Sequence, residues 1–214
     1  MSINKRVLAF TSIRSDYDLM SELYQKIHVD SHLELGLIVS GAHMSSSYGY
    51  TIKYIREDHL PIIAEIESLL DSDSPGSRLK SASILLQNCM HNVISFNPDV
   101  ILYAGDREDV MVGALIGAYL KIPTIHFFGG DHAVDGNVDN LVRHAASKLS
   151  SLHFVAHEQH KSRLIKIGEP DNRIFVIGSP ALDKFVSTQH LDKQTVLNRM
   201  NCPQWEDYAL VIFH

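Results

Sequence analysis

The chain has 214 residues, of which 45% are apolar and 21% charged; this composition is typical of a globular protein with a sizeable core. Its formal charge of −6 comes without any run of basic residues, which disfavours a nucleic-acid-binding protein because phosphate backbones require a concentrated positive surface. The apolar run 7–13 is too short to span a membrane and lacks a signal-peptide cleavage site. We therefore expect a cytoplasmic protein with neither nucleic-acid nor membrane partners.

Short apolar, β-branched runs alternate with helical patterns along the chain. Continuous hydrophobic runs of about four to eight residues are typical of parallel strands covered on both faces. The predicted strands are 6–12, 33–41, 99–105, 122–130, 152–156 and 173–179. Segments with helical periodicity are 17–29, 48–57, 79–96, 110–120, 140–150 and 159–167. This order predicts an α/β protein with a doubly wound, Rossmann-like parallel sheet.

Two segments depart from the alternation. The segment 70–81 combines proline, glycine and several serines, which predicts a loop before the long third helix. After residue 179 the pattern indicates a helix and a linker that lead to one more strand, 208–214. We interpret residues 1–185 as a Rossmann-like amino-terminal domain. Residues 186–214 are then a linker and the first strand of a second, nucleotide-binding domain, so the chain is expected to be a fragment.

Polar side chains follow the predicted strands in chain order. In an open parallel sheet, ligands bind beyond the carboxyl ends of the strands, where the following loops meet. Four strands deliver side chains there that are able to bind phosphate or to move protons. The four segments that carry these side chains are TSIRSDYD, SGAHMSSSYG, AGDRED and FFGGDHAVDGNVDN.

Three of these segments each support a functional and a structural interpretation. Arg14 and Asp16 are candidates for binding a diphosphate, or form a surface pair at the start of the first helix. His43 lies beside three serines and contacts a sugar or phosphate, or is a satisfied loop histidine. Asp106 and Arg107 act as proton carrier and anion binder, or simply begin a helix.

The stretch after the fourth strand is rich in acids. Asp131, Asp135 and Asp139 lie in a glycine-rich loop, where neighbouring carboxylates separate one another's pKa values and supply an acid and a base near neutral pH. Arg143 and His144 lie about one helical turn beyond the last of them. The alternative is a polar loop in which Asp139 only caps the next helix.

Metal and cofactor motifs are not found at these positions. An EF-hand beginning at Asp131 fails because Ala133 and Val142 occupy ligand positions. A zinc site would need further ligands beside His132 and His144. The glycines form neither a dinucleotide fingerprint nor a P-loop. The two cysteines have no motif spacing, so we predict reduced thiols, no metal and no cofactor.

Five motifs, in order, resemble one family. They are SIRSDYDLM, GAHMSSSYGYT, NPDVILYAGDRED, GGDHAVDGNVDNLVRHAASKLSSLHF and RIFVIGSPALDKF, and together they resemble the amino-terminal half of the hydrolysing UDP-N-acetylglucosamine 2-epimerases. The resemblance implies a two-domain glycosyltransferase-B-type fold in a homo-oligomer, with UDP held largely by the second domain. It also implies elimination of UDP through a glycal, followed by hydration to N-acetylmannosamine for sialic-acid-type synthesis.

The resemblance assigns roles to residues where the motifs match. Asp106 and Asp139 match catalytic acids of the family, and Asp131 stands where the family has glutamate. Arg14 matches the basic residue of the first loop, and Arg143 and His144 match the RHA sequence that opens the next helix. The predicted catalytic residues are thus Asp106, Asp131, Asp139 and His144, of which the three aspartates are the candidates for proton transfer. The predicted substrate-binding residues are Arg14, Asp16, His43, Arg107 and Arg143.

The chain also departs from the family pattern. Phe128 stands in place of an acid expected to take part in catalysis, Asn140 replaces the second of two aspartates, and the loop is about two residues longer. Either Asp131 or Asp135 takes over the lost role, or the substrate is a different nucleotide sugar, or catalysis is lost in a binding module. A related nucleotide-sugar hydrolase or transferase on the same fold is a further alternative. We expect weak or no turnover by the 214 residues alone.

Overall fold

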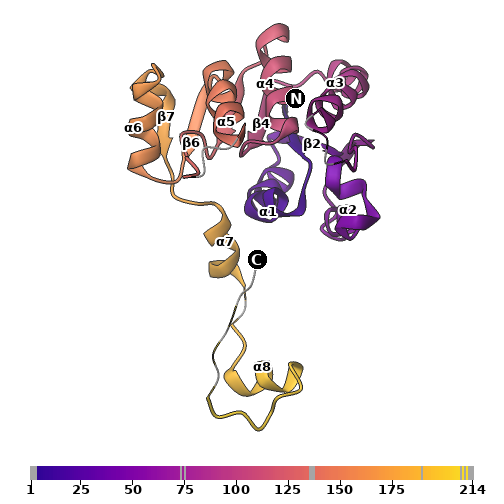
Figure 1. Ribbon diagram of the computed structural model, residues 1–214, viewed down its shortest axis with the longest axis vertical. Helices are drawn as coiled ribbons and strands as arrows, with labels where there is room; N and C mark the ends of the chain where they lie inside the picture. The colour runs from indigo at the N-terminus through magenta and orange to yellow at the C-terminus, as the bar shows by residue number, and fades with distance from the viewer. Residues whose placement is uncertain are drawn as a thin grey trace.

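The computed structural model describes residues 4–72, 74, 76–134, 138–188, 190–207, 209 and 211. Its centre is a parallel sheet with the strand order β3-β2-β1-β4-β5-β6-β7 (Figure 1). The strands are β1 Lys5–Thr11, β2 Leu33–Ser40, β3 Ile62–Ile66, β4 Val100–Ala104, β5 Thr124–Phe127, β6 Leu152–Val155 and β7 Ile174–Val176. This arrangement confirms the prediction of a doubly wound, Rossmann-like α/β fold.

Helices cover both faces of the sheet. They are α1 Arg14–Val29, α2 Ile52–Glu57, α3 Ser77–Phe96, α4 Glu108–Leu120, α5 Val138–Leu149, α6 Glu158–Lys166, α7 Ala181–Ser187 and α8 Lys193–Arg199. The described residues also form the short 3-10 helices η1 Gly41–Met44, η2 Ser46–Tyr48 and η3 Asp171–Arg173. Side chains of α1 and α2 pack on one face of the sheet, and side chains of α3, α4 and α5 pack on the other. The core therefore has the two layers that a doubly wound sheet requires.

The spacing of apolar residues explains how the helices pack. In α1, Tyr17, Met20, Tyr24 and Ile27 are buried at intervals of three or four residues, which places them on one side of the helix. In α4 most of the residues are buried, because this helix lies over the middle of the sheet between α3 and α5.

The six strands predicted between residues 6 and 179 are present, but the sequence interpretation missed β3. This strand has only five residues and includes Glu65, so it lacks the long continuous apolar run that marks the central strands. The predicted loop 70–81 is too long, because α3 begins at Ser77. The predicted strand 208–214 lies mostly outside the described residues.

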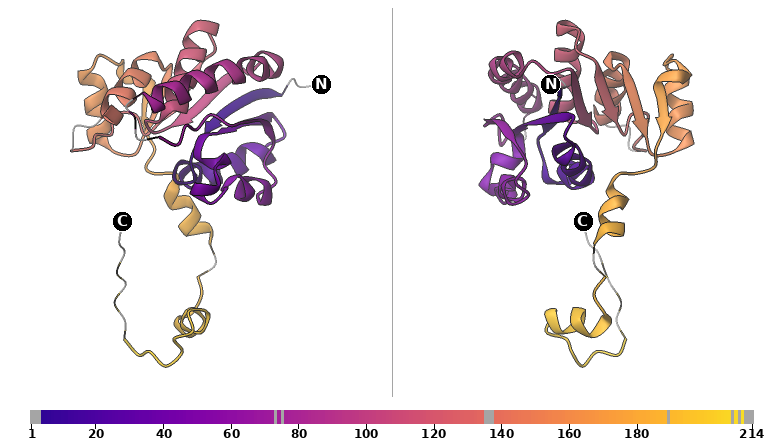
Figure 2. Two further views of the ribbon diagram at one scale, coloured as in Figure 1. Left: turned by 45° about the vertical axis from the view of Figure 1, so that its right-hand side comes forward. Right: turned by 180° about the vertical axis from the view of Figure 1, so that it is seen from behind.

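The last described segment leaves the sheet. α7 lies beside α1, where Lys26 Nζ is 2.9 Å from Asp183 Oδ2 and Lys184 Nζ is 3.5 Å from Asp18 Oδ1. Beyond it, α8 lies well away from the sheet in both views of Figure 2. In the part of the chain that the structure describes, no helix is long and apolar enough to cross a membrane.

Candidate functional site

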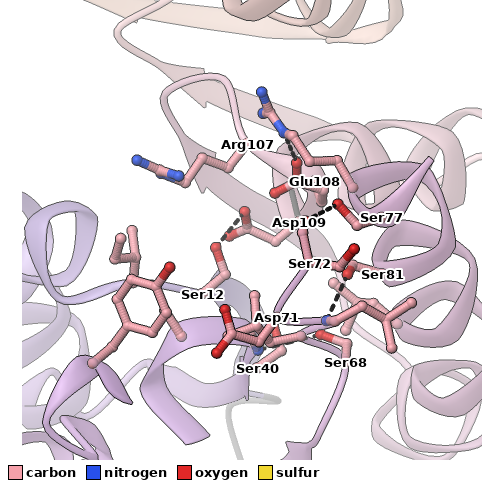
Figure 3. A pocket seen from close by; sticks show the side chains of 18 residues that line it. Ser12, Ser40, Ser68, Asp71, Ser72, Ser77, Ser81, Arg107, Glu108 and Asp109 are labelled. Atoms are coloured by element: carbon pink, nitrogen blue, oxygen red, sulfur yellow. Dashed lines mark hydrogen bonds and ion pairs between the residues drawn. The ribbon is translucent and has the colours of Figure 1, made fainter. Parts of the chain in front are cut away.

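The crevice forms where the chain changes direction across the sheet. β1 continues through α1 to β2 on one side, whereas β4 continues through α4 to β5 on the other. Loops that leave the carboxyl ends of β1 and β4 therefore diverge and open a crevice, which is where ligands bind in such sheets. A cavity of about 220 Å³ lies there and is lined by hydroxyls of Ser12, Ser40 and Ser68 together with Arg78, Arg107 and Asp109 (Figure 3).

Arg143 is the centre of a charged cluster at the ends of β4 and β5. It forms an ion pair with Asp106, its Nη1 lies 3.5 Å from Asp131 Oδ2, and it donates a hydrogen bond of 3.1 Å to the carbonyl oxygen of Phe128. Its side chain is only 11% exposed. On the outer side, His160 Nε2 lies 3.4 Å from Asp131 Oδ1. Three predicted residues are therefore brought together by one guanidinium.

Phe128 adopts a left-handed backbone conformation, with φ of 62°. Non-glycine residues rarely occupy this region, which costs energy unless the surroundings hold it. Its amide donates to the carbonyl of Phe154 at 3.0 Å, its own carbonyl accepts from Arg143, and its side chain packs against the core on the α1 face. The aromatic ring that replaces the expected acid is thus part of the packing beneath the crevice.

Asp139 and His144 contact residues other than Arg143. Asp139 Oδ1 accepts a hydrogen bond of 2.9 Å from Arg78 Nη1, and Arg78 also pairs with Glu108. The ring of His144 is stacked on that of His132 with centroids 6.0 Å apart, and its Nδ1 is buried without a hydrogen-bond partner. Burial, and then the neighbouring His132, lower the pKa of His144, which favours a neutral imidazole.

Asp109, in the first turn of α4, lines the cavity, and Asp16, in the first turn of α1, lies beside the cavity residue Arg107. Asp109 is 1% exposed and accepts a hydrogen bond of 2.8 Å from Ser12 Oγ. Arg107 Nε lies 3.8 Å from Asp16 Oδ2. Burial raises the pKa of Asp16 to about 6, and burial followed by the charge of Asp16 raises that of Asp109 to about 7.

Arg14 lies at the open edge of the crevice. Its Nε is 3.2 Å from Asp18 Oδ2, its guanidinium lies 4.9 Å from the centre of the Tyr54 ring, and its side chain is 57% exposed. It is therefore accessible to a bound anion. Arg14 and Lys53 both line a neighbouring pocket.

His43 does not reach the crevice surface. It is fully buried, and its two ring nitrogens lie 3.0 Å from Thr11 Oγ1 and 2.8 Å from Thr51 Oγ1. Burial lowers its pKa to about 4, so the ring is neutral at physiological pH. The prediction that His43 contacts substrate does not fit this arrangement. The alternative interpretation, a satisfied loop histidine, fits it instead.

Sequence reasoning missed two residues of the site, Arg78 and Asp109. Arg78 fell in the segment interpreted as a loop, and only the fold brings it to Glu108 and Asp139. Asp109 follows Asp106 by three residues. A helix that begins between them places Asp109 in its first turn, so its position near Asp106 could have been predicted from the sequence. Asp135, one of the predicted acids, lies outside the described residues. Among those described, no group of three or more potential ligands is arranged to hold a metal ion.

This fold and crevice define an α/β protein with an acid and arginine cluster at its ligand-binding edge. Residues 25–214 match the model of the UDP-N-acetylglucosamine 2-epimerase family, and the chain belongs to this family. The UDP-N,N'-diacetylbacillosamine 2-epimerase (hydrolyzing) of Legionella pneumophila is 33% identical over 98% of this chain and 55% of its own length. The UDP-N-acetylglucosamine 2-epimerase of Neisseria meningitidis is 32% identical over 98% of this chain and 54% of its own length.

Solved structures have the same fold. A UDP-N-acetylglucosamine 2-epimerase crystal structure is similar with a TM-score of 0.76 and 20% identity, over 93% of this chain and 53% of that one. The Neisseria meningitidis enzyme bound to UDP-GlcNAc is similar with a TM-score of 0.71 and 19% identity, over 92% and 52%. The chain thus spans about half the length of the relatives that it matches.

Proposed function

We propose that the crevice is the amino-terminal wall of the active site of a hydrolysing UDP-N-acetylglucosamine 2-epimerase. Membership of the family supports the epimerase class. The single observation that carries the proposal is the buried Arg143, which holds Asp106 and lies close to Asp131 at the ends of two adjacent strands. Such a cluster supplies proton carriers and a fixed positive charge next to the place where a diphosphate leaves.

The proposed reaction has two halves. In the first, a carboxylate takes the proton from C2 of the sugar, the electrons of that bond form the C1–C2 double bond, and UDP leaves C1 with the bonding pair. In the second, water adds its hydroxyl to C1, and a proton is added to C2 from the opposite face. We assign proton transfer to Asp131, Asp139 and Asp106, and binding of the diphosphate to Arg14 and Arg107.

The remaining cleft is proposed to come from a second domain. The relatives are nearly twice as long as this chain, and we propose that residues 186–214 lead into that domain, which would hold most of the UDP. The 214-residue chain alone is then expected to show weak turnover or none.

The test uses a chain that continues beyond His214 into a second domain, incubated in heavy water. The substrates are UDP-N-acetylglucosamine and UDP-N,N'-diacetylbacillosamine, the second because two relatives are named for it. Release of UDP with deuterium at C2 of the free sugar is expected for one of them. If neither substrate releases UDP or gains deuterium, the proposal is wrong for both.

A second candidate is a nucleotide-sugar-binding module without catalysis. It is favoured by Phe128, whose side chain packs with the core where the family resemblance implies an acid. Tight binding by calorimetry without release of UDP would support this candidate. A related hydrolase would instead release UDP without deuterium at C2, so product analysis by NMR separates all three outcomes.

A further inference from the structure

Two carboxyl groups meet beneath the crevice from opposite faces of the sheet. Asp16 belongs to the first turn of α1, and Asp109 to the first turn of α4. The helices α1 and α4 follow the neighbouring strands β1 and β4 at the same edge of the sheet, and the charge of Asp16 lies close enough to Asp109 to raise its pKa. Asp109 is 1% exposed and the Asp16 side chain 19%. Buried acids are rare unless they are paired or functional.

The two carboxyls have different partners. Asp109 is fixed by the hydrogen bond of 2.8 Å from Ser12 Oγ. In contrast, Asp16 Oδ2 is buried without a hydrogen-bond partner, and Arg107 Nε at 3.8 Å is too distant to donate one. Gly105, with φ of 88°, lies next to this oxygen and has no side chain. A Cβ at this position would lie 4.0 Å from Asp16 Oδ2.

The other acids of the crevice are already engaged. Asp106 pairs with Arg143, Asp139 with Arg78, and Asp131 lies near both Arg143 and His160. Asp16 differs because its buried Oδ2 accepts no hydrogen bond, although Arg107 forms an ion pair with it at 3.8 Å and Ser15 donates to the other oxygen, Oδ1, at 3.3 Å. A buried, unsatisfied oxygen costs stability and requires an explanation, of which a functional role is one.

Charges around the pair favour the retention of a proton. Burial is the main cause that raises the pKa of Asp16 to about 6 and that of Asp109 to about 7. Asp106 and Glu108 add to these shifts, and arginines oppose the shift of Asp16. The groups that face the pair are Arg107, Arg143, Asp106, Glu108, Tyr24, Ser12 and Ser15. Because the two sites interact, they titrate as a unit in which one proton persists toward neutral pH.

Resting on the proposed function, we propose that Asp16 is a proton-transfer residue of the crevice and that Asp109 is its positioning residue. In the hydration half of the reaction, Asp16 gives its proton to C2 of the glycal, whose double-bond electrons form the new C–H bond. The hydroxyl of water bonds to C1, and its remaining proton passes to a second carboxylate. Asp109, held by Ser12, keeps a second acid beside Asp16 and does not touch the sugar.

The first experiment uses the Asp16→Asn variant of the chain extended into a second domain. We expect deuterium incorporation at C2 to fall by about 100-fold or more, as loss of a general acid does, while nucleotide-sugar binding by calorimetry is retained. UDP and a glycal accumulate, because elimination does not need this proton. Glu22→Gln, on the same helix, is the control and keeps wild-type turnover. Turnover of Asp16→Asn within about threefold of wild type overturns the proposal.

The second experiment measures the carboxyl titration of Asp109 by carbon-detected NMR in the 214-residue chain. We expect a midpoint near the value of about 7, which falls in Asp16→Asn because the neighbouring charge of Asp16 is removed. In the extended chain, Asp109→Asn still accepts the Ser12 hydrogen bond, so the fold is retained, and the pH profile of turnover is expected to change. An unchanged Asp109 midpoint in Asp16→Asn overturns the role of Asp109.

These experiments distinguish the inference from the proposed function. If the wild-type extended chain turns over neither nucleotide sugar, the proposed function and the proton-transfer role fail together. If the wild type turns over and Asp16→Asn does so equally well, only the role of Asp16 fails.

Discussion

At the residue scale, Arg143 joins the chemistry of the crevice to the backbone beneath it. Its guanidinium reaches Asp106 and Asp131, and also the carbonyl of Phe128, whose left-handed backbone lies directly after β5. A planar guanidinium can satisfy several acceptors in different directions, which an ammonium group cannot do equally well. Arg143 therefore fixes the positions of the acids and places a positive charge beside them.

Replacement of Arg143 by alanine is expected to lower the free energy of unfolding by about 3 kcal/mol, because Asp106 loses its partner in a largely buried position. Arg143→Lys is expected to recover part of this loss, since it keeps the charge but not the second hydrogen bond. Urea unfolding followed by circular dichroism measures both. The control Arg199→Ala removes an exposed arginine of α8 and should leave the transition unchanged. Equal stabilities for all three variants would contradict the role of Arg143.

The burial of His43 between Thr11 and Thr51 determines how the free energy of unfolding depends on pH. The pKa of His43 falls from 6.5 to about 4 on folding, so the unfolded chain binds more protons between these values. The contribution of neutral His43 to the free energy of unfolding is complete above about pH 6.5. It is lost as the pH falls toward 4, by up to about 1.4 kcal/mol per pH unit. We expect His43→Gln to flatten this part of the curve in urea unfolding at several pH values. The difference between the two proteins isolates His43, because the other titrating groups are common to both; identical slopes would refute the assignment.

The candidate site could be predicted from the sequence only as far as single loops. The order of strands placed Asp16, Asp106 and Asp131 at one edge, because the direction of parallel strands determines where each loop begins. Which groups pair there depends on residues distant in sequence, such as Arg78 with Asp139. The same limit explains His43: three neighbouring serines suggested a polar surface, whereas its partners proved to be Thr11 and Thr51.

At the element scale, most of the fold could be predicted, because central strands and amphipathic helices carry strong periodic signals. β3 could not, since an edge strand of five residues with Glu65 and only intermediate burial has a pattern shared by many loops. The start of α3 was placed late because Pro75 and Gly76 dominate the local sequence. Its first turn instead carries Arg78, whose contacts with Glu108 and Asp139 come from other helices.

The packing of α4 on the sheet depends on two glycines. A Cβ at Gly117 would overlap Thr124 and lie 3.1 Å from the carbonyl oxygen of Ile122, and one at Gly113 would lie 2.9 Å from the Tyr103 ring. We expect Gly117→Ala to lower the free energy of unfolding by about 1–3 kcal/mol, because overpacking exceeds the gain in helix propensity. Thermal unfolding measures the change. Gly76→Ala is the matched control, with nothing within 4 Å of the added carbon, and a similar loss in both variants would contradict this explanation.

At the scale of the whole molecule, the sheet and the last segment differ in how much they contribute to stability. Val155, Leu164 and Ile174 form a small core that packs α6 against β6 and β7, and β6 pairs with β5 of the sheet. By contrast, α8 lies apart from the sheet (Figure 2). Two of its residues form hydrogen bonds within the same segment, from Gln194 to the carbonyl of Pro203 at 3.3 Å and from the Thr195 amide to Asp192 at 2.9 Å. The stability of the described domain should therefore come from the residues before α8.

Removal of the last segment tests this division. A chain that ends at Thr188 loses α8 and is expected to unfold at the same urea concentration as the 214-residue chain, within about 0.5 kcal/mol. A chain that ends at His157 keeps Val155 but loses Leu164 and Ile174, so it exposes apolar surface worth several kcal/mol and should unfold much more easily, at about 1.5–3 kcal/mol per buried side chain. Circular dichroism follows both transitions. A large loss of stability in the Thr188 chain would mean that residues 190–211 pack on the domain in solution, and the proposed division near residue 185 would then have to be moved.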